Sequence, residues 1–437
     1  MKATVIGAGL AGCEAANALA SYGIEVDIYE QKPKSYSDAH KYQGFAELVC
    51  SNSLKASRLE SASGMLKEEM RRLNSLIIPC AEQTAVGAGG ALAVDRKLFS
   101  DLVTAKIKEN PLINVIEQEV KSLSFDTPIV VATGPLTSDA LADEILKLTG
   151  SEHLSFYDAA APIVTAESID MSIAFEASRY DRGDADYLNC PMNKEEYENF
   201  LKALVEAESA PLKAFEKEHF KVYEGCMPIE VMAKRGSDTI RFGPLKPVGL
   251  IDPRTGHRPW AVVQLRKENS EGTLYNIVGF QTNLKWGEQK RVFSMIPSLQ
   301  NAEFARYGVM HRNTFLDSPR ALNRYFQLVK NPDIWFAGQL TGVEGYVESA
   351  ASGLIVGHNL ARTMLGLKLI DLPKETMLGA LSDHISDVTK TDFQPMGSNM
   401  GILPSLPDRI KDKSKRYLCL AERGINELQK TLREIDF

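Results

Sequence analysis

The chain has 437 residues, of which 44% are hydrophobic and 24% charged, and its formal net charge is −7 at pH 7. These values predict a folded protein of about two to three domain-sized units and exclude a disordered chain. The acidic total excludes a uniformly basic nucleic-acid-binding protein, although a total can conceal a local basic surface.

No apolar run is long enough to span a membrane, and no secretory signal opens the chain. The six cysteines lie far apart, without a Cys-x-x-Cys pair or a Cys/His cluster, so we expect neither a disulfide framework nor a metal site. Together these features predict a cytoplasmic protein.

The first 30 residues predict a dinucleotide-binding unit. A short apolar strand leads into Gly7-Ala8-Gly9-Leu10-Ala11-Gly12, followed by an alanine-rich helix and a second strand that ends at Glu30. Gly7 suits the tight turn, Gly9 lets the backbone approach a pyrophosphate, and Gly12 brings the helix close to the strand. The helix N-terminus attracts phosphate. Glu30 is placed to accept a ribose hydroxyl, and its charge disfavours the 2′-phosphate of NADP.

Two later segments favour FAD at this unit. Residues 128–134 form an apolar strand that ends at Thr133 and Gly134. Residues 333–339 form another, which ends at Gly338-Gln339 and leads through Gly345 into an apolar helix. This order resembles the two-dinucleotide-fold flavoproteins, in which an aspartate is usual where this chain has Gln339. The replacement exchanges a charged contact with the cofactor for a hydrogen bond.

We therefore expect an α/β fold with a Rossmann-like FAD-binding domain made of residues 1–160 and 326–437. Residues 161–325 are expected to form an inserted α+β domain on the substrate side. Periodicity predicts helices over 64–73, 194–207, 209–219 and 413–432, a helix that starts near Asp95-Arg96, and a strand within 273–280.

Two cysteines have surroundings that favour a reactive thiolate. Cys50 ends an apolar segment and begins the polar run Cys-Ser-Asn-Ser, which predicts a helix N-terminus whose dipole stabilises the thiolate. Cys226 follows a glycine, and the cations Lys234 and Arg235 come shortly after it. For both residues the alternative is a buried, unreactive cysteine.

Charge is concentrated in blocks. Residues 231–291 hold eleven basic and five acidic residues, a net charge of +6, whereas residues 170–225 carry −6. The basic block contains aromatic residues, Trp286 among them, and cations with aromatic rings suit phosphate contacts and base stacking. Lys234, Arg235 and Arg241 are its candidate RNA contacts. The alternative is a solvated mixed surface, and the same two interpretations apply to Arg409, Lys411, Lys413, Lys415 and Arg416.

His311 is a further candidate substrate residue. It follows an apolar segment shortly before the second Gly-rich junction, where its ring could stack on a flat heterocycle such as folate or flavin. The alternative is a hydrogen-bonded core histidine.

Segments throughout the chain resemble the folate- and FAD-dependent tRNA uracil-5-methyltransferases. They are GAGLAGCEAA at 7–16, FAELVCSNSLKA at 45–56, GGALAVDR at 89–96, ATGPLTS at 132–138, FYDAAAPIV at 156–164, YLNCPM at 187–192, EGCMPIEVMAKRG at 224–236, FGPLKPVGL at 242–250, YNIVGFQTNLKWG at 275–287, RYGVMHRNTF at 306–315 and AGQLTGVEGYVESAASGL at 337–354. The two cysteine segments are specific to that family. A relative that modifies the tRNA wobble uridine shares the last segment. Minor departures are Gly87, where proline is usual, and residues 41–44.

The resemblance implies a mechanism. Cys226 matches the nucleophile that attacks carbon 6 of uracil, and Cys50 matches the base that removes the proton from carbon 5. Methylenetetrahydrofolate is the implied carbon donor, through reduced FAD, with NADPH or NADH as reductant. The implied substrate is a uridine of the tRNA T-loop, which must leave its loop to react. No obligate protein partner is implied.

Three alternatives stay open. The same chemistry could act on a ribosomal RNA uridine. A wobble-uridine enzyme with a GTPase partner is disfavoured by the short chain and by the paired cysteine segments. A flavoprotein oxidoreductase without an RNA substrate is the alternative of a different class.

Overall fold

Strand β1 (Lys2–Ile6) lies at the centre of a parallel sheet. The computed structural model describes the chain except residues 38, 151–153, 182–183, 211–226 and 392, and the side chains of 154–158, 181 and 311–312. Within the described residues the sheet has the order β16–β7–β1–β2–β6. The other four strands are β2 (Glu25–Glu30), β6 (Ile113–Glu117), β7 (Ile129–Val131) and β16 (Ile334–Phe336). Since the paired strands are parallel, their carboxyl ends share one edge.

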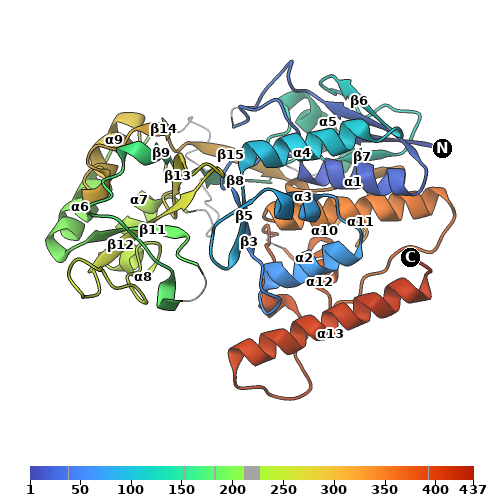
Figure 1. Ribbon diagram of the computed structural model, residues 1–437. Helices are drawn as coiled ribbons and strands as arrows, with labels where there is room; N and C mark the ends of the chain where they lie inside the picture. Colours follow the sequence, from blue (N-terminus) through green and yellow to red (C-terminus); the bar gives the residue numbers. More distant parts are fainter. Residues whose placement is uncertain (38, 151–153, 182–183, 211–226, 392) are drawn as a thin grey trace.

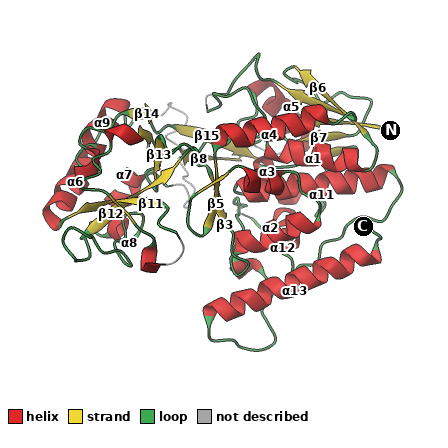
Figure 2. Ribbon diagram, in the orientation of Figure 1, coloured by secondary structure: helices red, strands yellow, loops and turns green. Residues whose placement is uncertain are grey.

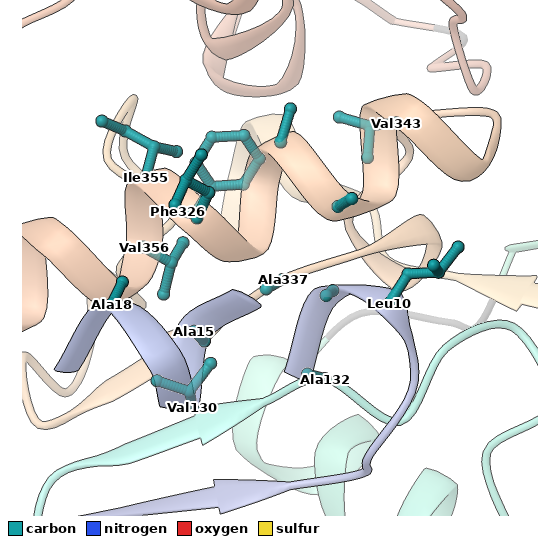
Figure 3. Close-up of a cluster of buried hydrophobic side chains, with 14 of the residues drawn as sticks. Leu10, Ala15, Ala18, Val130, Ala132, Phe326, Ala337, Val343, Ile355 and Val356 are labelled. Atoms are coloured by element: carbon teal, nitrogen blue, oxygen red, sulfur yellow. The ribbon is translucent and has the colours of Figure 1, made fainter. Parts of the chain in front are cut away.

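Two helices from opposite ends of the chain pack against each other on this sheet. They are α1 (Leu10–Ser21) and α11 (Tyr346–Met364), and Figure 3 shows their small and aliphatic side chains together. The contact is close because glycine faces backbone: a Cβ on Gly353 would lie 2.1 Å from the carbonyl oxygen of Ala11. Residues near both termini therefore form one hydrophobic core.

The middle of the chain forms a second, antiparallel sheet with the order β10–β11–β12–β13–β9–β14 among the described residues. Its strands are β9 (Ile163–Thr165), β10 (Phe175–Glu176), β11 (Tyr187–Met192), β12 (Ala261–Lys267), β13 (Leu274–Ile277) and β14 (Phe304–Arg306). Its helices are α6 (Lys194–Glu206), α7 (Ile229–Lys234), α8 (Thr239–Phe242) and α9 (Trp286–Phe293). A separate core of residues within 164–302 lies between them.

Smaller elements lie between and around these two parts. A two-stranded sheet of β8 (Leu154–Ala159) and β15 (Met310–Phe315) lies between them in Figure 1. A three-stranded sheet combines β3 (Ser53–Ala56), β4 (Ala85–Val86) and β5 (Ala91–Val94). The remaining α-helices are α2 (Ala62–Arg72), α3 (Ile77–Gln83), α4 (Arg96–Glu109), α5 (Asp139–Thr149), α10 (Ser318–Ala321), α12 (Met377–Ser386) and α13 (Lys413–Glu434). Figure 2 shows α13 running along the outside of the first part.

The α/β, Rossmann-like fold with an inserted α+β part is confirmed. Helices α2, α4, α6 and α13 form where periodicity predicts them, and part of the helix expected over 209–219 lies outside the described residues. Phe315 and Leu316, near the end of the expected insertion, pack into the first core. No described helix is both long and apolar enough to cross a membrane.

Candidate active site

The junction between β1 and α1 has the geometry that a bound diphosphate requires. Gly7 has φ +98°, and a Cβ on Gly12 would lie 1.8 Å from the carbonyl oxygen of Gly7, so the turn is tight and the helix lies against the strand. Gly9 caps α1 and has open space where a Cβ would be. No side chain of the described residues caps the helix, so its first N–H groups can receive phosphate oxygens.

Glu30 links the end of β2 to this junction. Its carboxylate is buried, with Oε2 accepting the N–H of Ala8 at 2.9 Å and Oε1 accepting the N–H of Lys32 at 3.0 Å. Each oxygen keeps a lone pair for another donor, such as a ribose hydroxyl. The two backbone bonds hold the carboxylate in position for that contact.

One cavity extends along the carboxyl edge of the parallel sheet. Its lining includes Gly7, Ala8, Gly9, Leu10, Ala11, Glu30, Thr133, Gly134, Gly338 and Gln339 from the predicted set. Gly12 is not among the lining residues because it packs under the turn, and Gly345 instead caps α11 behind Tyr346. The cavity thus unites the junctions after β1, β2, β7 and β16, which are far apart in sequence, and its chemistry fits an adenine dinucleotide.

The second junction holds Gln339 through a neighbouring side chain. The amide Nε2 of Gln339 donates to Oε2 of Glu344 at 2.6 Å, while the N–H of Gly338 donates to Ser352 Oγ at 2.7 Å. The amide orientation presents the carbonyl oxygen of Gln339 as the remaining acceptor. Gln339 can therefore hydrogen-bond a cofactor but cannot supply the charge of an aspartate.

Cys50 lies next to this cavity, since its neighbour Val49 and the phenol of Tyr346 both line it. The N–H of Cys50 donates to Tyr346 Oη at 2.7 Å, and its Sγ donates to the carbonyl oxygen of Ala159 at 3.5 Å. The thiol is partly exposed. Cys50 is thus held between the parallel-sheet part and strand β8.

The helix N-terminus predicted at Cys50 is wrong. The segment turns there and continues as the short strand β3. Asn52 determines this course, because its buried amide donates at 3.0 Å to the carbonyl oxygens of both Val94 and Lys267. The dipole expected from a helix starting at Cys50 therefore does not exist.

Three arginine side chains, and not a helix that starts at Cys50, provide positive charge at the Cys50 segment. Arg96 and Arg306 donate to the carbonyl oxygen of Cys50 at 3.1 and 3.3 Å, and Arg266 donates to Ser51 Oγ and Asn52 Oδ1, both at 2.9 Å. These arginines come from α4, β14 and β12. Arg96, Arg306 and Tyr346 lie inside the resembling segments and Arg266 lies between two of them. Nothing in their local pattern marks these residues, because their role depends on contacts between distant elements.

Cys226 lies outside the described residues. The side chain of His311 is also outside them, but its backbone lies in β15 and pairs with Asp158 of β8. Lys234 and Arg235 are exposed at the end of α7. Arg241 is half-buried, with its guanidinium 3.8 Å from the ring centroid of Trp260 and its Nε donating to the Trp260 carbonyl oxygen. Its side chain therefore takes part in packing on Trp260.

An aromatic stack that the sequence did not indicate lies on the inserted part. The ring of Tyr307 stacks on that of Trp286, with centroids 5.7 Å apart, and on that of Phe304, with centroids 5.1 Å apart. Both pairs are within 12° of parallel. Trp286 is 62% exposed, so the outer end of the stack is open to another flat ring. Among the described residues, no group of three or more His, Cys, Asp or Glu side chains could hold a metal ion.

The chain matches the family model described as "Glucose inhibited division protein A" over residues 2–368. It is 59% identical over 425 residues to the methylenetetrahydrofolate–tRNA-(uracil-5-)-methyltransferase of Acetivibrio thermocellus, covering 97% of each chain. The enzyme of the same name from Enterococcus faecalis is 56% identical over 435 residues, covering 100% of this chain and 99% of the relative. Among solved structures, GidA of Aquifex aeolicus superposes with a TM-score of 0.71 at 17% identity, over 99% of this chain and 73% of that one, which shows the shared fold.

Proposed function

This chain belongs to the family of the methylenetetrahydrofolate–tRNA-(uracil-5-)-methyltransferases, and we propose that it methylates carbon 5 of a uridine in the T-loop of tRNA. The carbon donor is methylenetetrahydrofolate, the bound cofactor is FAD, and NADPH or NADH is the reductant. The family agrees with the one that the sequence segments indicate. The structural observation that carries the proposal is the position of Cys50 beside a dinucleotide cavity.

FAD fits this cavity on two grounds. The uncapped start of α1, with open space at Gly9, suits the diphosphate, and the Glu30 carboxylate suits a ribose. Gly338, Gln339 and Tyr346 then line the flavin end. When bound and reduced, FAD supplies the hydride that completes the methyl group.

In this proposal Cys226 is the nucleophile and Cys50 the base in the reaction of the pyrimidine. Carbon 5 of uracil is a weak nucleophile, and addition of the Cys226 thiolate to carbon 6 makes it enolate-like. After carbon 5 has gained the one-carbon unit, the Cys50 thiolate removes its proton. Release of Cys226 then restores the ring. Cys226 is assigned from its sequence segment, and the contacts around Cys50 support a position at the flavin end of the cavity.

The inserted part supplies the RNA surface in this proposal. Lys234 and Arg235 suit phosphate contacts, and the outer face of Trp286 suits an unpaired base of the loop. Residues 1–160 and 326–437 then hold the cofactor, with residues 161–325 facing the RNA. Since tRNA is matured in the cytoplasm, we place the protein there, with no obligate protein partner.

The test is mass mapping of 5-methyluridine in tRNA treated with the protein, methylenetetrahydrofolate and NADPH. We expect methylation of one T-loop uridine, its loss in Cys226→Ala, and its retention in Cys419→Ala, which changes a cysteine on the remote helix α13. A ribosomal RNA transcript is treated in parallel. Methylation of that transcript alone supports the ribosomal alternative, whereas purified protein without a flavin spectrum contradicts the proposal.

A further inference from the structure

Among the described residues, the side chains that reach the Cys50 segment carry more positive than negative charge. The guanidinium groups of Arg96, Arg266 and Arg306 all reach residues 50–52. Among the described residues, Glu268 forms an ion pair with Arg96, and the phenol of Tyr346 accepts the N–H of Cys50. An anion at Cys50 would therefore be favoured electrostatically.

A β-bulge turns Arg306 toward Cys50. Phe304 pairs with Val164 and Arg306 with Ile163, so the strand gains one residue between them. In a regular strand, residues two positions apart share a face, so Arg306 would lie on the face of Phe304, which packs on the second core. With the bulge, Arg306 shares the opposite face with Asn276 and Arg266, directly across the sheet. Arg266 contacts residues 51 and 52, so this face is the one against the cysteine segment.

The hydrogen-bond donors of the Arg306 guanidinium are only partly satisfied. Its Nη2 donates to the Cys50 carbonyl oxygen, but its buried Nε has no hydrogen-bond partner among the residues that the structure describes. Burial, and after it the like charge of Arg96, lowers the pKa of Arg306, while Glu268, Cys50 and Tyr346 oppose this change. A buried cation with an unpaired donor and a cationic neighbour costs free energy, which a nearby anion would offset.

We propose that Arg306 is a positioning residue that stabilises the thiolate form of Cys50. The inference rests on the proposed function, in which Cys50 acts as the base. When the thiolate takes the proton, the bond between carbon 5 and hydrogen breaks and its electron pair stays on the pyrimidine. The sulfur lone pair forms the new S–H bond, and the Ala159 carbonyl oxygen, 3.5 Å from Sγ, is placed to accept it. Arg306 thus favours the state before proton transfer and Ala159 the state after it.

The experiment measures the thiolate fraction of Cys50 in the intact flavin-loaded protein without RNA. The rate of iodoacetamide alkylation at Cys50 is followed by peptide mass spectrometry across pH, with Cys419 as the reference thiol. In Arg306→Gln we expect the pH midpoint to rise by about 1, with about tenfold slower alkylation at neutral pH, and in Arg306→Lys we expect most of the shift to be reversed. Arg320→Gln, which removes an exposed guanidinium elsewhere, controls for net charge.

The pH midpoint of Cys50 alkylation is the decisive quantity. A change in how accessible the thiol is alters the plateau rate of alkylation but not this midpoint. An Arg306→Gln midpoint equal to that of the wild type, with the flavin spectrum retained, overturns the inference. Full methylation by Cys50→Ala together with a shifted Arg306→Gln midpoint contradicts the proposed base and upholds the effect of Arg306 on the thiol. The two failures are therefore distinguishable.

Discussion

Two glycines of the N-terminal fingerprint have different surroundings, one suited to packing and the other to ligand binding. A Cβ at Gly12 meets the backbone of Gly7, whereas a Cβ at Gly9 meets nothing within 4 Å. These contacts agree with the two roles expected from the sequence, helix–strand packing for Gly12 and diphosphate approach for Gly9.

Gly12→Ala should therefore destabilise the cofactor-free protein by about 2–3 kcal/mol, because α1 must move away from the sheet. Gly9→Ala should change that stability by at most about 1 kcal/mol and weaken FAD binding instead. Thermal unfolding of cofactor-stripped protein and flavin titration measure the two effects. Unchanged FAD affinity in Gly9→Ala would show that no phosphate comes close to this residue.

Trp286 offers a direct optical test of the RNA surface. We expect tRNA to quench tryptophan fluorescence, because Trp335 is buried and Trp260 is covered by Arg241. Trp286→Phe should lose the quenching and keep most of the affinity, while Trp286→Ala should bind about tenfold more weakly, as expected for one lost stacking contact. Tyr36→Ala, an exposed aromatic position on the first part, is the control. Equal quenching in Trp286→Phe and the wild type would place the RNA elsewhere.

Helices far from the cavity are connected by buried carboxylates. Glu69 of α2 accepts the N–H groups of Met377 and Leu378 at the start of α12, at 2.7 and 3.0 Å. Burial raises the pKa of Glu69 to about 8, against the opposing effect of these two bonds. The C-terminal segment is thus docked onto α2 through a group that is protonated at neutral pH.

This docking predicts a pH dependence of stability. The folded protein retains a proton on Glu69 that the unfolded chain releases near pH 4.5, so its contribution to the free energy of unfolding falls between pH 4.5 and about 8. Relative to the wild type, Glu69→Gln should gain about 2–4 kcal/mol across that window, measured by urea unfolding at several pH values. Glu427→Gln, on α13, corrects for net charge. A constant difference between Glu69→Gln and the wild type would contradict the raised pKa.

The whole molecule combines an acidic net charge with a local basic block, residues 231–291, inside the inserted part. The net charge of −7 averages the +6 block against the −6 block before it. RNA binding should therefore follow the local block and depend strongly on salt. Among the candidate contacts, Lys234 and Arg235 are exposed at the end of α7, whereas Arg241 is half-buried against Trp260.

Replacing Lys234 and Arg235 by glutamine should weaken tRNA binding about tenfold at moderate salt and reduce the slope of log affinity against log salt by about 2. Filter binding at several salt concentrations measures both quantities. Lys97→Gln with Lys121→Gln removes the same charge from the first part and should have little effect. Equal losses in the two double variants would mean that only total charge matters.

Local patterns in the chain were sufficient for the family, the α/β fold and the residues around the cofactor cavity, because a dinucleotide site uses short turns whose residue types are dictated by backbone geometry. The surroundings of Cys50 could not be obtained in this way. The Cys50 segment leads into a strand and does not start a helix, because Asn52 donates hydrogen bonds to Val94 and Lys267. The arginines that contact this segment come from α4, β12 and β14. Such contacts join residues up to 256 positions apart, so only the folded chain brings them together.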